Sequence, residues 1–312
     1  MRLVFLGTPQ FAVPTLERVV EAGHEIAGVF TQPDRPKGRG HKESVSPIKQ
    51  AALRLKLPVH QPERVRRPEV VAQLAALRAD AMVVVGYGQI IPQSIIDLPK
   101  LGIINVHGSL LPAYRGAAPI QWAIARGETR TGVTTMRIDA GLDTGDILLQ
   151  WETGIAAEET AVELGYRLAA AGADLLVETL AGLQSGAIMP EKQDNAKATY
   201  APILKKEDGH IDWGLPALEI SNRIRGFQPW PGCYTEFRGQ RLHIWKATPA
   251  PGNASIAGTV FVRGHQVYVA CGEGTALELL EIQLEGRKRI TADAFRNGYP
   301  IAENERLGEQ AK

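Results

Sequence analysis

The sequence predicts a Rossmann-like, doubly wound and mostly parallel α/β sheet, followed by a small β domain. Short apolar runs alternate with helical patterns through the first half of the chain. These runs lack a polar face, as strands do when helices cover both sides of a sheet. The C-terminal part instead carries short strand patterns separated by Gly-rich turns. At 312 residues, the chain is too long for one average core, so two domains are expected.

The elements of the first half are expected in alternating order. Strands are predicted at 2–7, 26–31, 81–86 and 102–107, and helices at 11–22, 47–57 and 68–78. Residues 131–139 and 145–153 resemble paired outer strands, and 158–184 a long amphipathic helix. A polar stretch with weak periodicity follows, which predicts a first domain at 1–188, a linker at 189–206 and a second domain at 207–312. The second domain should hold a helix at 216–227 and strands at 241–247, 257–264, 266–272 and 276–283.

The composition excludes several classes of protein. Hydrophobic residues make up 44% and charged residues 22%, as in ordinary globular chains rather than disordered ones. Two cysteines without a CxxC motif predict neither a disulfide framework nor a thiolate zinc site. No apolar run suits a signal peptide or a membrane span, so a cytoplasmic protein is expected. The net charge of +1 gives no sign of an anionic partner.

The segment "INVHGSLLPAYRGAAP" (104–119) indicates a site. Asn105 and His107 are two positions apart, so they lie on the same side of a strand, near its end. In open α/β sheets, ligands bind outside the carboxyl ends of the strands, so the loops 7–9 and 86–88 should lie nearby. The first of these loops reads "GTPQFA", which lacks the Gly-rich pattern of a dinucleotide site, and no P-loop motif occurs.

Asp143 is the third candidate, within "RIDAGLDTGDI" (137–147). An Asp- and Gly-rich turn is the alternative interpretation. The segment follows an expected strand and should face the same sheet edge, where Asp143 would orient His107 while Asn105 donates to an oxygen that gains charge. No G-x-S-x-G nucleophile and no three-ligand metal set accompany them. The sequence therefore predicts direct acyl-type transfer between two bound substrates, with Asn105, His107 and Asp143 as the catalytic residues.

These motifs resemble a known family. "NVHGSLLPAYRGAAPIQWAI" together with "GLDTGDIL" resembles the folate-dependent formyltransferases, and "FTQPDRPKGRGHKESVSPIK", "IDWG" and "RGFQPWPG" are similar to its branch that acts on charged tRNA. The resemblance implies 10-formyltetrahydrofolate as donor without a metal, and methionine esterified to initiator tRNA as acceptor. It places Asn105 and His107 beside the formyl carbonyl and Asp143 in proton transfer. The expected folate-binding residues are Ser109, Leu110, Leu111, Pro112, Gly86 and Tyr87.

Basic residues supply the candidate tRNA contacts. Four lie in the Gly-bearing 34–42 loop and two in the linker: Arg35, Lys37, Arg39, Lys42, Lys205 and Lys206. The β domain is an OB-like candidate for nucleic-acid binding, although its charges nearly cancel, and further contacts are expected from Arg223, Arg225 and 287–289. Trp213, Trp230 and Trp245 are expected in the core rather than stacked on bases.

Two alternatives stay open. A formyltransferase for a small amine, such as a glycinamide ribonucleotide or an amino-sugar nucleotide, would share the Asn-His-Asp set, but the 34–42 loop and the β domain favour tRNA. An RNA-binding module without catalysis would make that set a coincidence. The chain is expected to act as a monomer.

Overall fold

The computed structural model describes residues 1–37, 42–252, 256–302 and 305–308. The chain forms two compact units, and neither is a single stretch of sequence. The first contains Met1–Gly116, Arg130–Thr153 and Gly165–Ala201, and the second contains Ala117–Thr129, Gly154–Leu164 and Pro202–Lys312.

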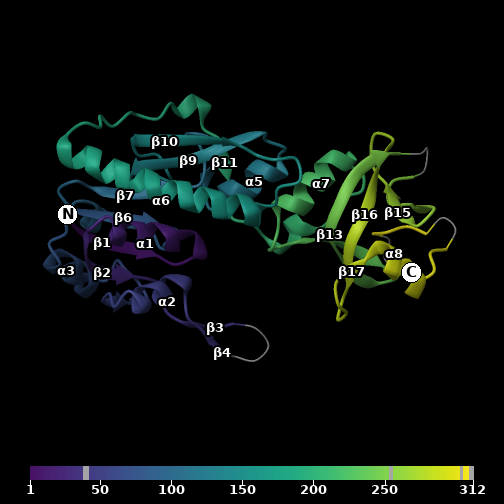
Figure 1. Ribbon diagram of the computed structural model, residues 1–312, viewed down its shortest axis with the longest axis horizontal. Coiled ribbons are helices and arrows are strands. Elements are labelled where there is room, and N and C mark those ends of the chain that lie inside the picture. The colour runs from purple at the N-terminus through teal and green to yellow at the C-terminus, as the bar shows by residue number, and fades with distance from the viewer. Residues whose placement is uncertain (38–41, 253–255, 303–304, 309–312) are drawn as a thin grey trace. The chain divides into compact units, whose positions relative to one another are not determined.

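A seven-stranded sheet in the order β10-β9-β7-β6-β1-β2-β5 forms the centre of the first unit (Figure 1). Its strands are β1 (Arg2–Gly7), β2 (Glu25–Phe30), β5 (Val59–His60), β6 (Ala81–Val85), β7 (Ile103–His107), β9 (Arg130–Arg137) and β10 (Ile147–Gly154). All pairs from β7 to β5 are parallel. Every residue of β6 and β7 is buried, which explains their continuous apolar runs. The predicted doubly wound α/β fold is confirmed.

The helices of this unit are α1 (Val13–Glu21), α2 (Pro47–Arg54), α3 (Pro68–Ala76), α4 (Gln93–Ile96) and most of α6 (Ala161–Ser185). Prolines stand in the first turn of α1, α2 and α3, where a missing N–H costs nothing. Ser46 caps α2 by accepting a hydrogen bond from the Lys49 amide at 3.1 Å. The sequence did not predict α4 or the two-residue strand β5.

The neighbour of β7 on its outer side is antiparallel. His107 of β7 pairs with Thr134 of β9, and Ile104 pairs with Arg137, so β9 ends beside the start of β7. On one face of the sheet, α6 lies so close that a Cβ on Gly172 would be 2.8 Å from Val106 Cγ1. Since side chains alternate along a strand, Asn105 and His107 face the side of the sheet away from α6.

The basic segment predicted as a loop at 34–42 contains a short hairpin, β3 (Arg35–Lys37) paired antiparallel with β4 (Lys42–Ser44). Its base is anchored by Asp34, which pairs with Lys49 and accepts a hydrogen bond from Gln61 Nε2 at 2.9 Å. The hydrogen bond from Lys49 lowers the pKa of the Asp34 carboxyl.

The polar stretch after α6 makes definite contacts within the first unit. Glu191 forms a bridge with Ile147, the first residue of β10. Farther on, β11 (Tyr200–Ala201) pairs in parallel with β8 (Arg115–Gly116), and the Thr199 hydroxyl accepts a hydrogen bond from the Tyr114 amide at 2.8 Å. The weak periodicity of this stretch therefore reflects isolated backbone pairings and one short 3-10 helix, η2 (Asn195–Lys197), with no α-helix or long strand between Ser185 and Ala201.

The second unit contains an antiparallel sheet in the order β12-β13-β16-β15-β14, with β17 paired to β16 (Figure 1). The strands are β12 (Cys233–Phe237), β13 (Gln240–Pro251), β14 (Val260–Arg263), β15 (Gln266–Ala270), β16 (Thr275–Leu284) and β17 (Ile290–Thr291). The unit also holds α5 (Pro119–Ala125), α7 (Ala217–Gly226) and α8 (Ala292–Gly298). The predicted β domain is confirmed as an antiparallel sheet, although the sequence missed β12, α5 and α8.

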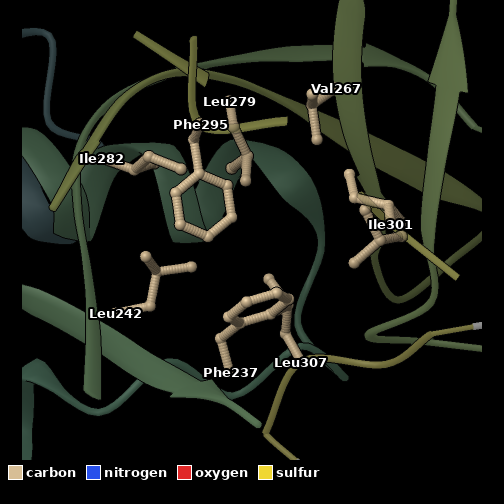
Figure 2. Close-up of a pocket in the computed structure, with 9 residues that line it drawn as sticks. Phe237, Leu242, Val267, Leu279, Ile282, Phe295, Ile301 and Leu307 are labelled. Carbon is tan, nitrogen blue, oxygen red and sulfur yellow. The ribbon is translucent and has the colours of Figure 1, made fainter. Parts of the chain in front are cut away.

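Side chains from the strands, from α8 and from the C-terminal segment fill the core of the second unit. Nine of them surround an apolar cavity of ≈ 10 Å³: Phe237, Leu242, Val260, Val267, Leu279, Ile282, Phe295, Ile301 and Leu307 (Figure 2). A cavity must offer roughly that volume together with polar partners to hold one water molecule. With no polar lining, the cavity is a packing space of the core rather than a ligand site.

Of the three tryptophans expected in the core, Trp213 is buried and donates to Thr235 Oγ1 at 3.1 Å. Trp230 is 55% exposed, so the expectation was wrong for this residue. Trp245 is half-buried on the outer side of β13. Among the helices in the described part of the chain, none combines the length and apolarity that a bilayer crossing requires.

Candidate functional site

Two polar side chains interrupt the apolar strand β7. Asn105 is 9% exposed and His107 is 6% exposed, on the face of the sheet that α6 does not cover. Burying an amide and an imidazole in a central strand costs free energy unless hydrogen bonds compensate. The contacts of these two side chains therefore indicate what the strand end does.

His107 lies between a carbonyl and a carboxylate. Its Nε2 is 3.0 Å from Tyr114 O, and its Nδ1 is 3.7 Å from Asp143 Oδ2. A carbonyl oxygen can only accept, so the short contact requires the proton on Nε2. In the neutral imidazole Nδ1 is then the acceptor nitrogen, and it faces the Asp143 carboxylate.

Asp143 reaches His107 by a route that the sequence did not predict. Because β9 is antiparallel to β7, the loop after β9 starts at the opposite end of β7 and returns over the sheet. The expectation that this loop follows a strand ending at the same edge was therefore wrong, although the carboxylate arrives beside the imidazole. Asp143 has a left-handed backbone, φ 52°, and its Oδ2 accepts a hydrogen bond from the Gly116 amide at 2.8 Å.

Asp139 stabilises the same loop from its own side. Its Oδ1 accepts from the Gly141 amide at 3.0 Å and from Thr144 Oγ1 at 2.7 Å. This carboxylate has the turn-forming role that was the alternative interpretation for Asp143. The loop thus contains one carboxylate that closes the turn and another that faces the imidazole.

Asn105 has unused hydrogen-bonding capacity. Within the described part of the chain, no group forms a hydrogen bond with its side-chain amide. A buried amide normally has partners, so one that remains available beside a polar cluster is suited to a bound ligand. Its N–H groups can donate to an oxygen, as the sequence analysis expected.

The predicted folate-binding segment 109–112 is held in place by internal hydrogen bonds. Ser109 Oγ donates to Ala113 O at 2.7 Å, and its carbonyl accepts from Thr134 Oγ1 at 2.7 Å. The Leu111–Pro112 peptide is cis, and the Leu111 carbonyl accepts from Gln150 Nε2 at 2.8 Å. Leu110 and Pro112 are partly exposed, whereas Ser109 and Leu111 are buried. Ser109 thus shapes the loop, and only part of this segment is open to a ligand.

Gly86 and Tyr87 were predicted beside the same ligand. Gly86 has φ 56°, and a Cβ there would lie 2.8 Å from Pro9 Cγ. The Tyr87 ring is 1% exposed within the apolar core around β1 and β6, while its carbonyl accepts from Thr8 Oγ1 at 3.1 Å. Burial raises the pKa of Tyr87 to about 12. The side chain of Tyr87 therefore belongs to the core.

The predicted tRNA contacts are spread over both units. Arg39 lies outside the described residues, as do the side chains of Arg35, Lys37 and Lys42 in the hairpin. Lys205 and Lys206 are exposed in the second unit, before α7. Two other expected contacts are engaged elsewhere: Arg223 pairs with Glu219, and Arg225 donates to Glu159 O at 3.0 Å.

Several residues near the site were not predicted. Thr134 and Gln150 connect β9 and β10 to the 109–112 segment through the bonds described above, and Gln150 Nε2 also donates to Thr134 Oγ1 at 3.0 Å. Arg115 and Gln193 form a second group near Asp143. None of these four belongs to a motif with a chemical signature, and only Arg115, within "YRGAAP", stood in a segment already singled out.

Comparisons with known proteins identify the family of this chain. The family model described as formyl transferase matches residues 1–180, and the one described as formyl transferase, C-terminal domain, matches residues 203–300. A methionyl-tRNA formyltransferase of Solibacter usitatus is 67% identical over 309 residues, 99% of each chain. The chain belongs to the methionyl-tRNA formyltransferase family. A second relative of the same name, from Koribacter versatilis, is 59% identical over 99% of each chain.

Solved structures show that this family member shares its fold with other formyltransferases. WlaRD, a sugar 3N-formyl transferase, aligns with a TM-score of 0.67 at 20% identity, covering 92% of this chain and 99% of its own. An N-formyltransferase from Helicobacter canadensis, in complex with folinic acid and dTDP-3-aminofucose, gives a TM-score of 0.65 at 19% identity. That alignment covers 89% of this chain and 98% of the other.

Proposed function

We propose that the chain transfers the formyl group of 10-formyltetrahydrofolate to the α-amino group of methionine esterified to initiator tRNA, giving N-formylmethionyl-tRNA. The observation that carries the proposal is the Asp143 carboxylate 3.7 Å from His107 Nδ1, beside an available Asn105 amide. Relatives named methionyl-tRNA formyltransferase match over 99% of the chain, which favours a charged tRNA as acceptor. The folinic acid in a neighbour of the same fold favours a folate donor.

The reaction is an acyl transfer that needs no oxidant. The neutral amine nitrogen attacks the formyl carbon and forms the new C–N bond, while the carbonyl electron pair moves to oxygen. When the intermediate collapses, the bond from carbon to N10 of the folate breaks, and the proton lost by the amine goes to N10. Donors near the oxygen stabilise its charge, and one such donor is typically worth about 3 kcal/mol.

The side chains divide these tasks. Asn105 donates from its amide to the developing oxyanion. His107 is held by Tyr114 O with Nδ1 toward Asp143, and a protonated Nδ1 adds a second donor. Asp143 stabilises the imidazolium electrostatically and takes part in the proton relay from the amine to N10. No step needs a metal ion.

The tRNA contacts are proposed at the basic residues and on the outer face of the antiparallel sheet. Leu242 and Ile244 of β13 point into the core, so Arg241, His243 and Trp245 point outward. His243 and Trp245 stack at 5.9 Å, Arg241 lies over the Tyr234 ring at 4.4 Å, and Arg289 over Trp245 at 5.2 Å. Rings and guanidinium groups in a row are suited to unpaired bases and phosphates.

The surroundings of His243 favour an uncharged imidazole ring, on which a base can stack. Burial, together with Arg241, lowers the pKa of His243, which favours its neutral form. The Trp245 ring is oriented by its own hydrogen bond to Gln283 Oε1 at 2.9 Å. The proposed tRNA-binding residues are therefore Lys205 and Lys206 with this outer face, together with Arg35, Lys37, Arg39 and Lys42 of the hairpin segment.

A formyl-transfer assay tests the proposal. The purified chain is given 10-formyltetrahydrofolate and initiator tRNA charged with methionine, with free methionine, a glycinamide ribonucleotide and a nucleotide-linked amino sugar as alternative acceptors. We expect formylation of the charged tRNA alone. Equal or faster transfer to a small amine would contradict the proposal.

The tRNA contacts have their own test. Replacing Lys205 and Lys206 by Ala together should raise KM for the charged tRNA and reduce the salt dependence of kcat/KM, since two phosphate contacts are lost. Lys100→Ala, at an exposed position of the first unit, is the matched control. An unchanged KM in the double variant would leave the outer face of the sheet and the hairpin segment as the remaining candidates.

A further inference from the structure

Gln193, in the polar stretch after α6, makes hydrogen bonds with both ends of its amide. Its Nε2 donates to Asp143 O at 2.9 Å and to Gly145 O at 2.7 Å. Its Oε1 accepts from Arg115 Nε at 3.0 Å and from Arg115 Nη2 at 2.8 Å. One side chain thus connects the backbone of the Asp143 loop to the segment that follows β7.

Arg115 is an unusual partner because its charge is buried. Its side chain is 2% exposed, and Nη2 also donates to Asn195 Oδ1 at 2.9 Å. Among the described residues, no carboxylate lies within ion-pair distance of this guanidinium. A buried cation satisfied only by amide oxygens is costly to maintain. Fixing the position of neighbouring groups is one role attributed to such buried charges.

The loop that Gln193 holds has little freedom to find another conformation. Asp143 has a left-handed backbone. Gly145 packs so tightly that a Cβ there would lie 1.9 Å from Arg137 O. The carboxylate is fixed at its other end by the Gly116 amide, the residue next to Arg115. The backbone and the side chain of Asp143 are therefore held by two neighbouring residues, Arg115 acting through Gln193 and Gly116 acting directly.

We propose that Gln193, oriented by Arg115, is a positioning residue that sets the distance between the Asp143 carboxylate and His107 Nδ1. The inference rests on the proposed function only in its kinetic consequences. A glutamine suits this position because it can accept from Arg115 and donate to two carbonyls at once. Glutamate can keep the contact with Arg115 but has no N–H for the loop. Methionine keeps the side-chain length and offers neither a donor nor an amide oxygen.

The kinetic test compares Gln193→Met and Gln193→Glu with Gln93→Ala. Gln93 is the first residue of α4, and its amide donates to Asp97 Oδ1, the residue that follows this helix, so it is the matched control. Both Gln193 variants should lose about 10- to 100-fold in kcat, because a small misplacement of a catalytic group has that effect, with both KM values within about twofold of the parent. Retained kcat in folded Gln193→Glu would overturn the proposal, because the donated bonds would then be unnecessary.

A second measurement does not depend on activity. The Gly116 amide proton is protected by its bond to Asp143 Oδ2, so its hydrogen exchange reports whether the carboxylate is in place. In Gln193→Met we expect this exchange to be about tenfold faster or more, with unchanged exchange at β1 and β6. Unchanged exchange at Gly116 would overturn the inference about position. If the parent chain fails to formylate charged tRNA while Gly116 exchange responds as expected, the proposed function fails and the positioning role stands.

Discussion

Replacing Asp143 tests whether its carboxylate serves chemistry or only closes a turn. Asp143→Asn keeps an oxygen that can accept from the Gly116 amide, and asparagine tolerates the left-handed backbone at φ 52°. Asp143→Ala loses both the accepting oxygen and the tolerance for the left-handed backbone. We therefore expect the alanine variant to be less stable by about 2.5–5 kcal/mol, from about 1–2 for the left-handed conformation and about 1.5–3 for the hydrogen bond to a charged group. The asparagine variant should lose about 1 kcal/mol.

The losses of kcat in these two variants should not follow the order of their losses of stability. Both variants lack the negative charge that faces His107 Nδ1 at 3.7 Å, so both should lose about 10²- to 10⁴-fold in kcat. Initial rates with charged tRNA give kcat, and urea unfolding gives stability. Asp139→Asn is the matched control, because that carboxylate bonds only within its loop, to Gly141 and Thr144. If Asp143→Asn had a normal rate and pH profile, or Asp139→Asn were equally impaired, Asp143 would be a turn residue.

Three further predictions concern single side chains. His107→Ala should lower kcat by about 10²- to 10³-fold with little change in the Kd for the folate donor, measured by titration; a normal rate in the folded variant would remove His107 from the chemistry. The Tyr87 hydroxyl is buried without a hydrogen-bond partner among the described residues, and its pKa is raised from 10.0 to about 12. Between those pH values, Tyr87 ionises only in the unfolded chain. The free energy of unfolding should therefore fall as pH rises above 10, by up to about 2–3 kcal/mol more than in Tyr87→Phe. Unfolding measured at pH 9 and pH 12 tests this, and an equal loss of stability in the two proteins would contradict it. Phe237→Ala should cost about 3–5 kcal/mol in urea unfolding, since its ring lines the core cavity and packs edge-on against Phe295 at 5.1 Å; a loss below about 1 kcal/mol would mean that the core collapses onto the space.

The catalytic candidates could be predicted because the sequence places them in short, unusual contexts. Asn105 and His107 stand in an otherwise apolar strand, and the two-residue period fixes them on one face. Asp143 was harder, since its loop returns across the sheet only because β9 is antiparallel. Strand direction depends on pairings between distant segments, and periodicity contains no information about them.

The division into units could be predicted only in outline. The helix α5 and residues 154–164 belong to the second unit although they come before the end of α6. In the sequence, both segments stand between predicted elements of the first domain and therefore resemble its connections. The core of the second unit includes Ala118 and Ala125 next to residues more than 75 positions later, such as Leu204. Small apolar residues in a short helix do not show which core they join, because many cores would accept them.

The contacts of residues 191–201 bear on how such enzymes can be recombined. A designer who exchanged the C-terminal part of the chain at residue 188 would import a foreign Gln193, Asn195 and Thr199 along with it. The host loop at Asp143 would then have to fit a segment from another lineage. A crossover after Ala201 keeps these partners with the strands they contact. Natural substitutions along 191–201 should likewise be constrained by the sequence of the 139–146 loop, because Gln193 bonds the carbonyls of Asp143 and Gly145.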